Sequence, residues 1–70
     1  MNMQPVNSSK IIAIGYNMSS EILRIQFPTG TYDYFGVPRY LYESLMGAFS
    51  KTRYYARFIK DYFSYSVVNA

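Results

Sequence analysis

The basic residues in the last third of the chain have a spacing that would suit an anionic partner. Arg53, Arg57 and Lys60 recur at i, i+4 and i+7, so a helix would carry them on one side. Lys51 and Ser50 stand at the expected start of that helix, where backbone amides would face an anion. The row is equally consistent with an ordinary solvated helix face. Contact with phosphate or an acidic protein surface would instead give salt-dependent affinity.

Aromatic residues accompany these cations. Tyr54 borders the basic row, and Tyr40 and Tyr42 lie near the start of a preceding predicted helix. Tyrosine beside basic residues would stack on unpaired bases, but tyrosine is also common in protein interfaces. The candidate residues for partner or nucleic-acid binding are Lys51, Arg53, Tyr54, Arg57, Lys60, Arg24 and Phe35.

The residue types argue against catalysis. The chain has no Cys and no His, which removes thiol chemistry, disulfides and the usual zinc ligand sets. Its four acids, at 21, 33, 43 and 61, are scattered over a turn, a strand and two helices, and its glycines are too dispersed for a phosphate-binding loop. We therefore expect no enzymatic activity, cofactor, metal site or small-molecule substrate. An enzyme that uses tyrosine hydroxyls is a weaker alternative.

Length and composition predict one small packed domain. The chain has 70 residues, of which 50% are hydrophobic and 20% aromatic, and its net charge of +3 permits nucleic acid as a partner without requiring it. The longest apolar run has four residues, Ile11 to Ile14, so we expect no membrane span, no signal peptide and a cytoplasmic location. We predict a mobile or extended arm at 1–9, an ordered domain at 10–62 and a tail at 63–70 that either runs along the domain or frays.

Three strands are predicted at 11–16, 21–27 and 31–35, where apolar and polar residues alternate. A tight turn at Thr29-Gly30 places Phe27 opposite Tyr32 and Ile25 opposite Tyr34. The pair Tyr32 and Tyr34 would then lie on the apolar face and form a core tyrosine pair. A loop longer by one residue would bury Asp33 on that face, which is unfavourable.

The first hairpin has its predicted tip at Met18-Ser19. This register sets Ile14 opposite Leu23 and Ile12 opposite Ile25, so all four side chains would share the apolar face. The other face would stay uncovered by helices and could take a partner, unless the segment 63–68 folds back over it. Its predicted members are Ile11, Ala13, Ile22, Arg24, Gln26, Asp33 and Phe35.

Two helices are predicted after Pro38, which fits the first turn of a helix. Ser50 would cap the second helix, which we expect to reach about Tyr62. The apolar residues at helical spacing are Leu41, Leu45, Ala48 and Phe49 in the first helix, and Tyr55, Phe58, Ile59 and Tyr62 in the second. The predicted fold is α+β, with a three-stranded antiparallel meander followed by two helices packed on one sheet face (β-β-β-α-α).

Five segments of the chain together have the order and spacing of a known family. They read SSKIIAIGY, LRIQF, YDYFGVP, LMGAFSKTRYY and FIKDYFSY, and they span residues 8–65. In this respect the chain resembles the KTSC domain, a small module found alone in bacterial and phage proteins and appended to some lysyl-tRNA synthetases. The resemblance equates the family's central tyrosine pair with Tyr32 and Tyr34, its Ser-Ser start with Ser8 and Ser9, and its Ser-Lys pair with Ser50 and Lys51.

The resemblance implies a binding function. An RNA-binding role has been proposed for the family, although this chain has Thr52, Ala56 and Phe58 where the family often has glycine, a polar residue and histidine. Any contact that those polar groups make with RNA does not carry over. The compact form with a short arm is also similar to small phage regulators of host RNA polymerase. Our leading hypothesis is therefore a module that binds bacterial RNA polymerase, inhibits initiation and suppresses termination; the alternative is a single-stranded RNA-binding module.

Overall fold

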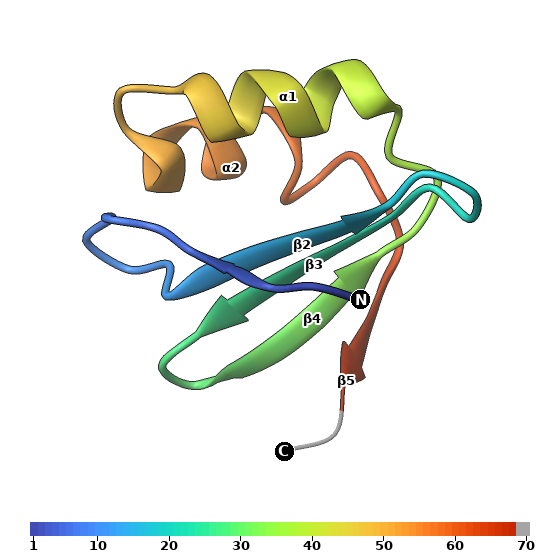
Figure 1. The fold of residues 1–70 in the computed structure, drawn as a ribbon, viewed down its shortest axis with the longest axis horizontal. Coiled ribbons are helices and arrows are strands. Elements are labelled where there is room, and N and C mark those ends of the chain that lie inside the picture. Colours follow the sequence, from blue (N-terminus) through green and yellow to red (C-terminus); the bar gives the residue numbers. More distant parts are fainter. Residues whose placement is uncertain (69–70) are drawn as a thin grey trace.

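The computed structural model describes residues 1–68 as one antiparallel sheet with two helices on one side (Figure 1). The strand order follows the sequence, β1-β2-β3-β4-β5. No helix in this part of the chain has the length and apolar character needed to cross a membrane. The elements are β1 (Gln4–Pro5), β2 (Ala13–Asn17), β3 (Ile22–Phe27), β4 (Gly30–Tyr34), α1 (Arg39–Gly47), α2 (Lys51–Phe58) and β5 (Tyr65–Val68).

The predicted three-stranded sheet is wrong, because the sheet has five strands, although the α+β class holds. Part of the predicted arm, Gln4–Pro5, pairs with β2, and part of the predicted tail, Tyr65–Val68, pairs with β4. Edge strands hydrogen-bond on one side only and can be very short, so their sequence pattern is weak. Residues 69–70 of the predicted tail lie outside the described part.

The hairpin between β3 and β4 is displaced by two residues from the predicted register. Phe27 faces Gly30, so the tip is Pro28-Thr29 rather than Thr29-Gly30. Proline favours the second position of a tight turn and glycine its fourth, which explains the position of this tip. Because the displacement is even, every side chain keeps its predicted face. Tyr34, opposite Leu23, is only 3% exposed on the side of the helices, and Tyr32 is half-buried there.

The hairpin between β2 and β3 has a four-residue turn, 18–21, and not the predicted two-residue tip. The side-chain oxygen of Asn17 accepts hydrogen bonds from two backbone amides of this turn, at 2.9 and 3.2 Å. Glu21 closes the turn with a left-handed φ of 56°. Ile14 consequently faces Ile25, two residues from its predicted partner.

The face assignments of Ile11 and Ile12 are the reverse of those predicted. The amide of Ile12 donates to the carbonyl of Gln26 at 2.8 Å, although Ala13 is the residue that faces Gln26 in the ladder. Two successive residues therefore oppose one, as in a β-bulge, and the alternation changes there. Ile11 is buried in the core and Ile12 is 45% exposed.

The core fills the space between the helices and one face of the sheet. Burial of apolar side chains there is the main stabilising contribution, since the chain has no disulfide. Tyr34 also contributes to this core, and its hydroxyl hydrogen-bonds the hydroxyl of Tyr55 on α2. The fully buried members are Ile11, Ile14, Leu23, Ile25, Val37, Leu45 and Ile59.

The opposite face of the sheet is partly covered by the N-terminal segment. A Cβ built on Gly15 would lie 2.6 Å from the Sδ of Met3 and 2.9 Å from the backbone oxygen of Asn2. Only glycine leaves room for this close approach of the arm. The arm is also joined to α2, because the Ser8 hydroxyl lies 2.8 Å from the Thr52 hydroxyl. The segment 63–68 does not cover this face; its last four residues extend the sheet as β5.

Candidate functional site

The positive charge of the protein is concentrated on and after α2. Residues 1–68 contain two ion pairs, Arg24 with Asp33 and Arg39 with Glu43, and both lie outside α2. These pairs use two of the four acidic residues of the chain. Four of the five remaining basic residues lie within 51–60, and the sequence of α2 contains no acid. An anionic partner would therefore meet its strongest attraction at this helix.

Ser50 is the N-cap of α2, as predicted. The Ser50 side chain accepts a hydrogen bond from the amide of Arg53 at 3.4 Å, which caps the first turn. The helix ends at Phe58, one turn before the predicted end at Tyr62. The predicted apolar stripe is therefore wrong in its second half: Phe58 is 45% exposed and Tyr62 is 70% exposed, whereas Ile59 is buried.

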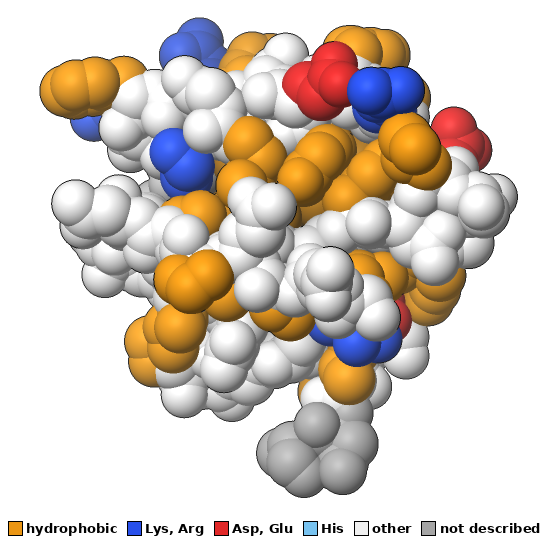
Figure 2. All heavy atoms as spheres, in the orientation of Figure 1, with side chains coloured by type: hydrophobic (Ala, Val, Ile, Leu, Met, Phe, Trp, Pro, Cys, Tyr) orange, Lys and Arg blue, Asp and Glu red, His pale blue; other side chains and the backbone are white. Residues whose placement is uncertain are grey.

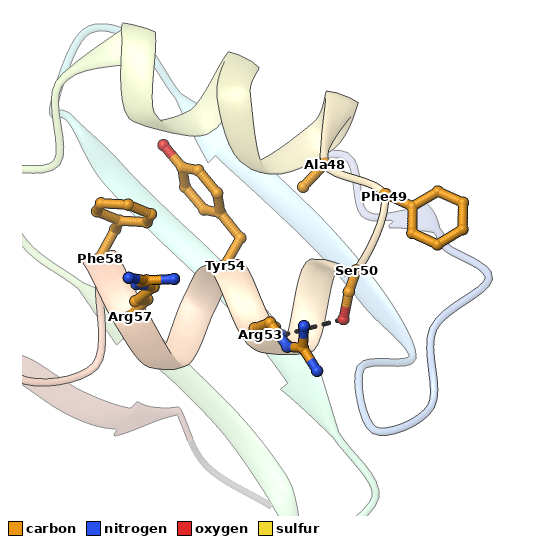
Figure 3. Close-up of a pocket in the computed structure, with 7 residues that line it drawn as sticks. All are labelled: Ala48, Phe49, Ser50, Arg53, Tyr54, Arg57 and Phe58. Atoms are coloured by element: carbon orange, nitrogen blue, oxygen red, sulfur yellow. Dashed lines mark hydrogen bonds between the residues drawn. The ribbon is translucent and has the colours of Figure 1, made fainter.

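Two rows of side chains run along α2, one cationic and one aromatic. Arg53 and Arg57 form a cationic row at i, i+4, and both point to the same side of the helix in Figure 3. Tyr54 and Phe58 form an aromatic row one residue further along, with ring centroids 4.6 Å apart. The structure thus places exposed guanidinium groups beside the half-buried ring of Tyr54 and the partly exposed ring of Phe58.

A surface hollow of about 250 Å³ opens between these rows and the loop before the helix. Phe49 precedes the helix cap. In many helices an apolar residue at this position packs against the side chain four residues after the cap, which here is Tyr54. Phe49 does not pack in this way: its relative exposure is 108%, and its ring points away from the helices in Figure 3. The space that it leaves is lined by Ala48, Phe49, Ser50, Arg53, Tyr54, Arg57 and Phe58. We call this space the first hollow.

The other two basic candidates near α2, Lys51 and Lys60, do not line the first hollow. The Lys51 ammonium donates to the carbonyl of Ala48 at 3.2 Å and holds the loop between the helices. Lys60 follows the end of α2 and lines a different hollow of about 320 Å³. The structure therefore brings together Arg53, Tyr54 and Arg57 from the predicted set, whereas Lys51 bonds the loop before the helix and Lys60 lines another hollow.

The candidates Arg24 and Phe35 lie away from α2. Arg24 donates two hydrogen bonds to Asp33, at 2.7 and 3.0 Å, and this contact raises the pKa of the guanidinium. Its charge is thus largely compensated within the sheet. Phe35 follows β4 and is partly exposed, and its backbone amide donates to the carbonyl of Ser64.

The hollow beside Lys60 is formed mainly by tyrosine rings. Burial, followed by the hydrogen bond with Tyr55, raises the pKa of Tyr34 well above its ordinary value, and burial also raises the pKa of Tyr55. Both hydroxyls therefore stay protonated near neutral pH and act as hydrogen-bonding groups, not as bases. This hollow is lined by Tyr32, Tyr34, Tyr55, Lys60, Asp61 and Tyr65.

A further hollow of about 230 Å³ lies on the other side of Phe58. We call it the second hollow, and it is distinct from the tyrosine hollow beside Lys60. Hydrophobic side chains also reach the surface in several places around the helix layer (Figure 2). The exposure of Phe49, Phe58 and Tyr62 was not predicted from the sequence, because these residues recur at the spacing typical of the buried face of a helix. The residues that line the second hollow are Tyr40, Leu41, Phe58, Tyr62 and Phe63.

The clustering of metal-ligand residue types gives no candidate metal centre among residues 1–68. No group of three or more His, Cys, Asp or Glu side chains comes together there.

Comparison with known proteins assigns most of the chain to one family. Residues 7–63 match the model of the KTSC domain, and the match includes both helices and both arginines of the first hollow. A protein from Tsukamurella paurometabola is 40% identical over 62 residues, which cover 87% of this chain and 92% of the relative. The crystal structure of a KTSC domain protein from Yersinia pestis has a TM-score of 0.95 and 40% identity, with 97% of each chain covered.

Proposed function

The chain belongs to the KTSC domain family, and from that premise we propose that it is a non-enzymatic module that binds single-stranded RNA through α2 and the loop before it. The observation that carries the proposal is the first hollow. Arg53 and Arg57 have no acidic partner among residues 1–68, and they flank a hollow that the rings of Tyr54 and Phe58 line. Unpaired bases stack on such rings while guanidinium groups contact the phosphates.

The aromatic row favours a single strand over a duplex. Bases within a double helix are stacked on one another, so exposed protein rings reach them only after the helix opens. The resemblance of the chain to the module appended to lysyl-tRNA synthetases supports RNA as the nucleic acid. The small size of the domain suits a role as an accessory binding surface.

Charge reversal on α2 tests this function. The variant Arg53→Glu with Arg57→Glu should abolish binding of a labelled single-stranded RNA in a fluorescence anisotropy titration. The milder Arg53→Ala with Arg57→Ala should reduce the slope of log affinity against log salt by about 1.4, because each lost phosphate contact on a single strand removes about 0.7. Unchanged affinity in both variants would reject the function.

A matched control separates the site from net charge. Lys10→Glu with Arg39→Glu changes the net charge by the same amount at positions outside the hollows. The Arg39 ion pair with Glu43 is exposed, so its loss should have little effect on stability. This control should retain most of the RNA affinity of the wild-type chain. An equal loss in the control would show that only net charge matters.

The second candidate function is attachment to bacterial RNA polymerase, with inhibition of initiation and suppression of termination. Phe49 favours a protein partner, because it is a fully exposed ring beside arginines, and aromatic residues and arginine are enriched in protein interfaces. The similarity to phage regulators of the host enzyme supports the identity of that partner. Immobilised protein should retain polymerase subunits from a bacterial lysate, and Phe49→Ala should release them. If a folded wild-type bait retains none, this candidate is rejected.

A further inference from the structure

The first and second hollows share the ring of Phe58 as a wall. The first lies between the loop before α2 and the helix, and the second lies between Phe58 and the segment that contains Tyr62. Phe58 is the residue that the two linings have in common, and its ring also packs on Tyr54 with centroids 4.6 Å apart. Their volumes of about 250 and 230 Å³ are below the roughly 300–1,000 Å³ of clefts for drug-sized ligands, so each suits a single flat ring system.

The two hollows differ in charge. Arg53 and Arg57 line the first hollow. The second is lined by Tyr40, Leu41, Phe58, Tyr62 and Phe63, so none of its lining residues among 1–68 carries a charge. A ligand that fills both would receive its charge contacts at one end and only aromatic and apolar contacts at the other.

We propose that the two hollows bind two successive unpaired bases of one RNA strand, with the ring of Phe58 between them. The inference rests on the proposed function and adds to it a minimum ligand, a single-stranded dinucleotide unit. Arg53 and Arg57 contact the phosphates beside the first base, and Tyr62 with Tyr40 encloses the second base. Stacking on aromatic side chains is tolerant of sequence, so the site selects for unpaired bases and not for a particular base.

The charge difference between the hollows makes this arrangement measurable. Loss of an arginine lowers both the affinity and its salt dependence, because a phosphate contact releases a counterion. Loss of a ring in the second hollow lowers the affinity and leaves the salt dependence as it was. A model in which only the arginines bind the strand predicts no effect of the second hollow.

The experiment is an anisotropy titration with a fluorescein-labelled hexauridylate at several salt concentrations. Tyr62→Ala and Tyr40→Ala should each weaken binding by about 5- to 150-fold with no change of slope, whereas Arg57→Ala should reduce the slope by about 0.7. Tyr62 and Tyr40 are both strongly exposed, so both variants should fold. Ile12→Ala is the control, since Ile12 is also an exposed hydrophobic residue and lines neither hollow.

The outcomes separate this inference from the proposed function. If Tyr62→Ala and Tyr40→Ala bind within twofold of the wild type while Arg57→Ala weakens binding, the two-base arrangement is wrong and RNA binding by α2 stands. If an RNA duplex binds as tightly as the single strand, the arrangement is also wrong. If the wild-type chain binds no hexauridylate, both the inference and the proposed function fail.

Discussion

The hydrogen bond between the hydroxyls of Tyr34 and Tyr55 joins β4 to α2, and its removal should destabilise the fold by an amount that depends on which hydroxyl is lost. Tyr34 is only 3% exposed, and its hydroxyl has the Tyr55 hydroxyl as its partner. In Tyr55→Phe the Tyr34 hydroxyl stays buried without that partner. Such a group destabilises a protein by about 1–3 kcal/mol.

The reverse substitution should have a smaller effect. Tyr34→Phe leaves unpaired the hydroxyl of Tyr55, a residue that is less buried than Tyr34 and therefore has better access to water, so we expect a loss of about 0.5–1.5 kcal/mol. The double variant leaves no unpaired hydroxyl at the contact. Because replacing both partners by apolar groups of the same shape is nearly neutral, the double variant should be more stable than Tyr55→Phe alone.

Urea unfolding followed by far-ultraviolet circular dichroism measures this cycle. For a domain of this size, each kcal/mol corresponds to about 4–8 °C in Tm, so the loss in Tyr55→Phe should also be visible in thermal melting. Tyr62→Phe, at an exposed ring, is the control and should change stability by less than about 0.5 kcal/mol. Additivity of the two single effects within about 0.3–0.5 kcal/mol would refute the reasoning.

Four further predictions concern the arm, the end of α1, the cap of α2 and alkaline pH. Gly15→Ala should destabilise the domain by about 1–3 kcal/mol and expose the arm to protease, because its Cβ would lie 2.9 Å from a backbone oxygen of the arm. Gly47→Ala, where nothing lies within 4 Å of the added atom, should instead stabilise it by about 0.4–1 kcal/mol in urea unfolding. Ser50→Ala should lower the free energy of unfolding by about 1 kcal/mol through loss of the cap, and an unchanged urea midpoint would contradict this. Because burial raises the pKa of Tyr34, the unfolded chain releases this proton first; the contribution of Tyr34 to stability should be constant below about pH 10 and fall above it by up to about 1.4 kcal/mol per pH unit, and Tyr34→Phe should remove this part of the alkaline loss.

The features predicted correctly from the sequence depend on local chemistry. Ser50 caps a helix because its side chain reaches an amide three residues ahead, and this requires no knowledge of the rest of the fold. Tyr34 lies on the side of the helices although the register of both hairpins was wrong by two residues. An even displacement preserves the faces of a strand, so alternation predicts a face more securely than it predicts a partner.

The features that were missed depend on contacts between distant parts of the chain. Gln4–Pro5 and Tyr65–Val68 are too short to show alternation, and they become strands only because β2 and β4 offer free edges. Ile12 points outward because of a local bulge opposite Gln26. The cationic row was predicted, but the hollow beside it was not, since it depends on the orientation of Phe49.

An NMR titration of the ¹⁵N-labelled chain with single-stranded RNA tests most directly whether α2 is the binding surface. The proposal predicts that the amide shifts which change most lie in residues 48–58 and around Tyr40 and Tyr62, with saturation at a single site. The amides of β1 and of the turn at 18–21 should change little. Largest changes in β5 and the tyrosine hollow beside Lys60, or no changes at high RNA concentration, would contradict it.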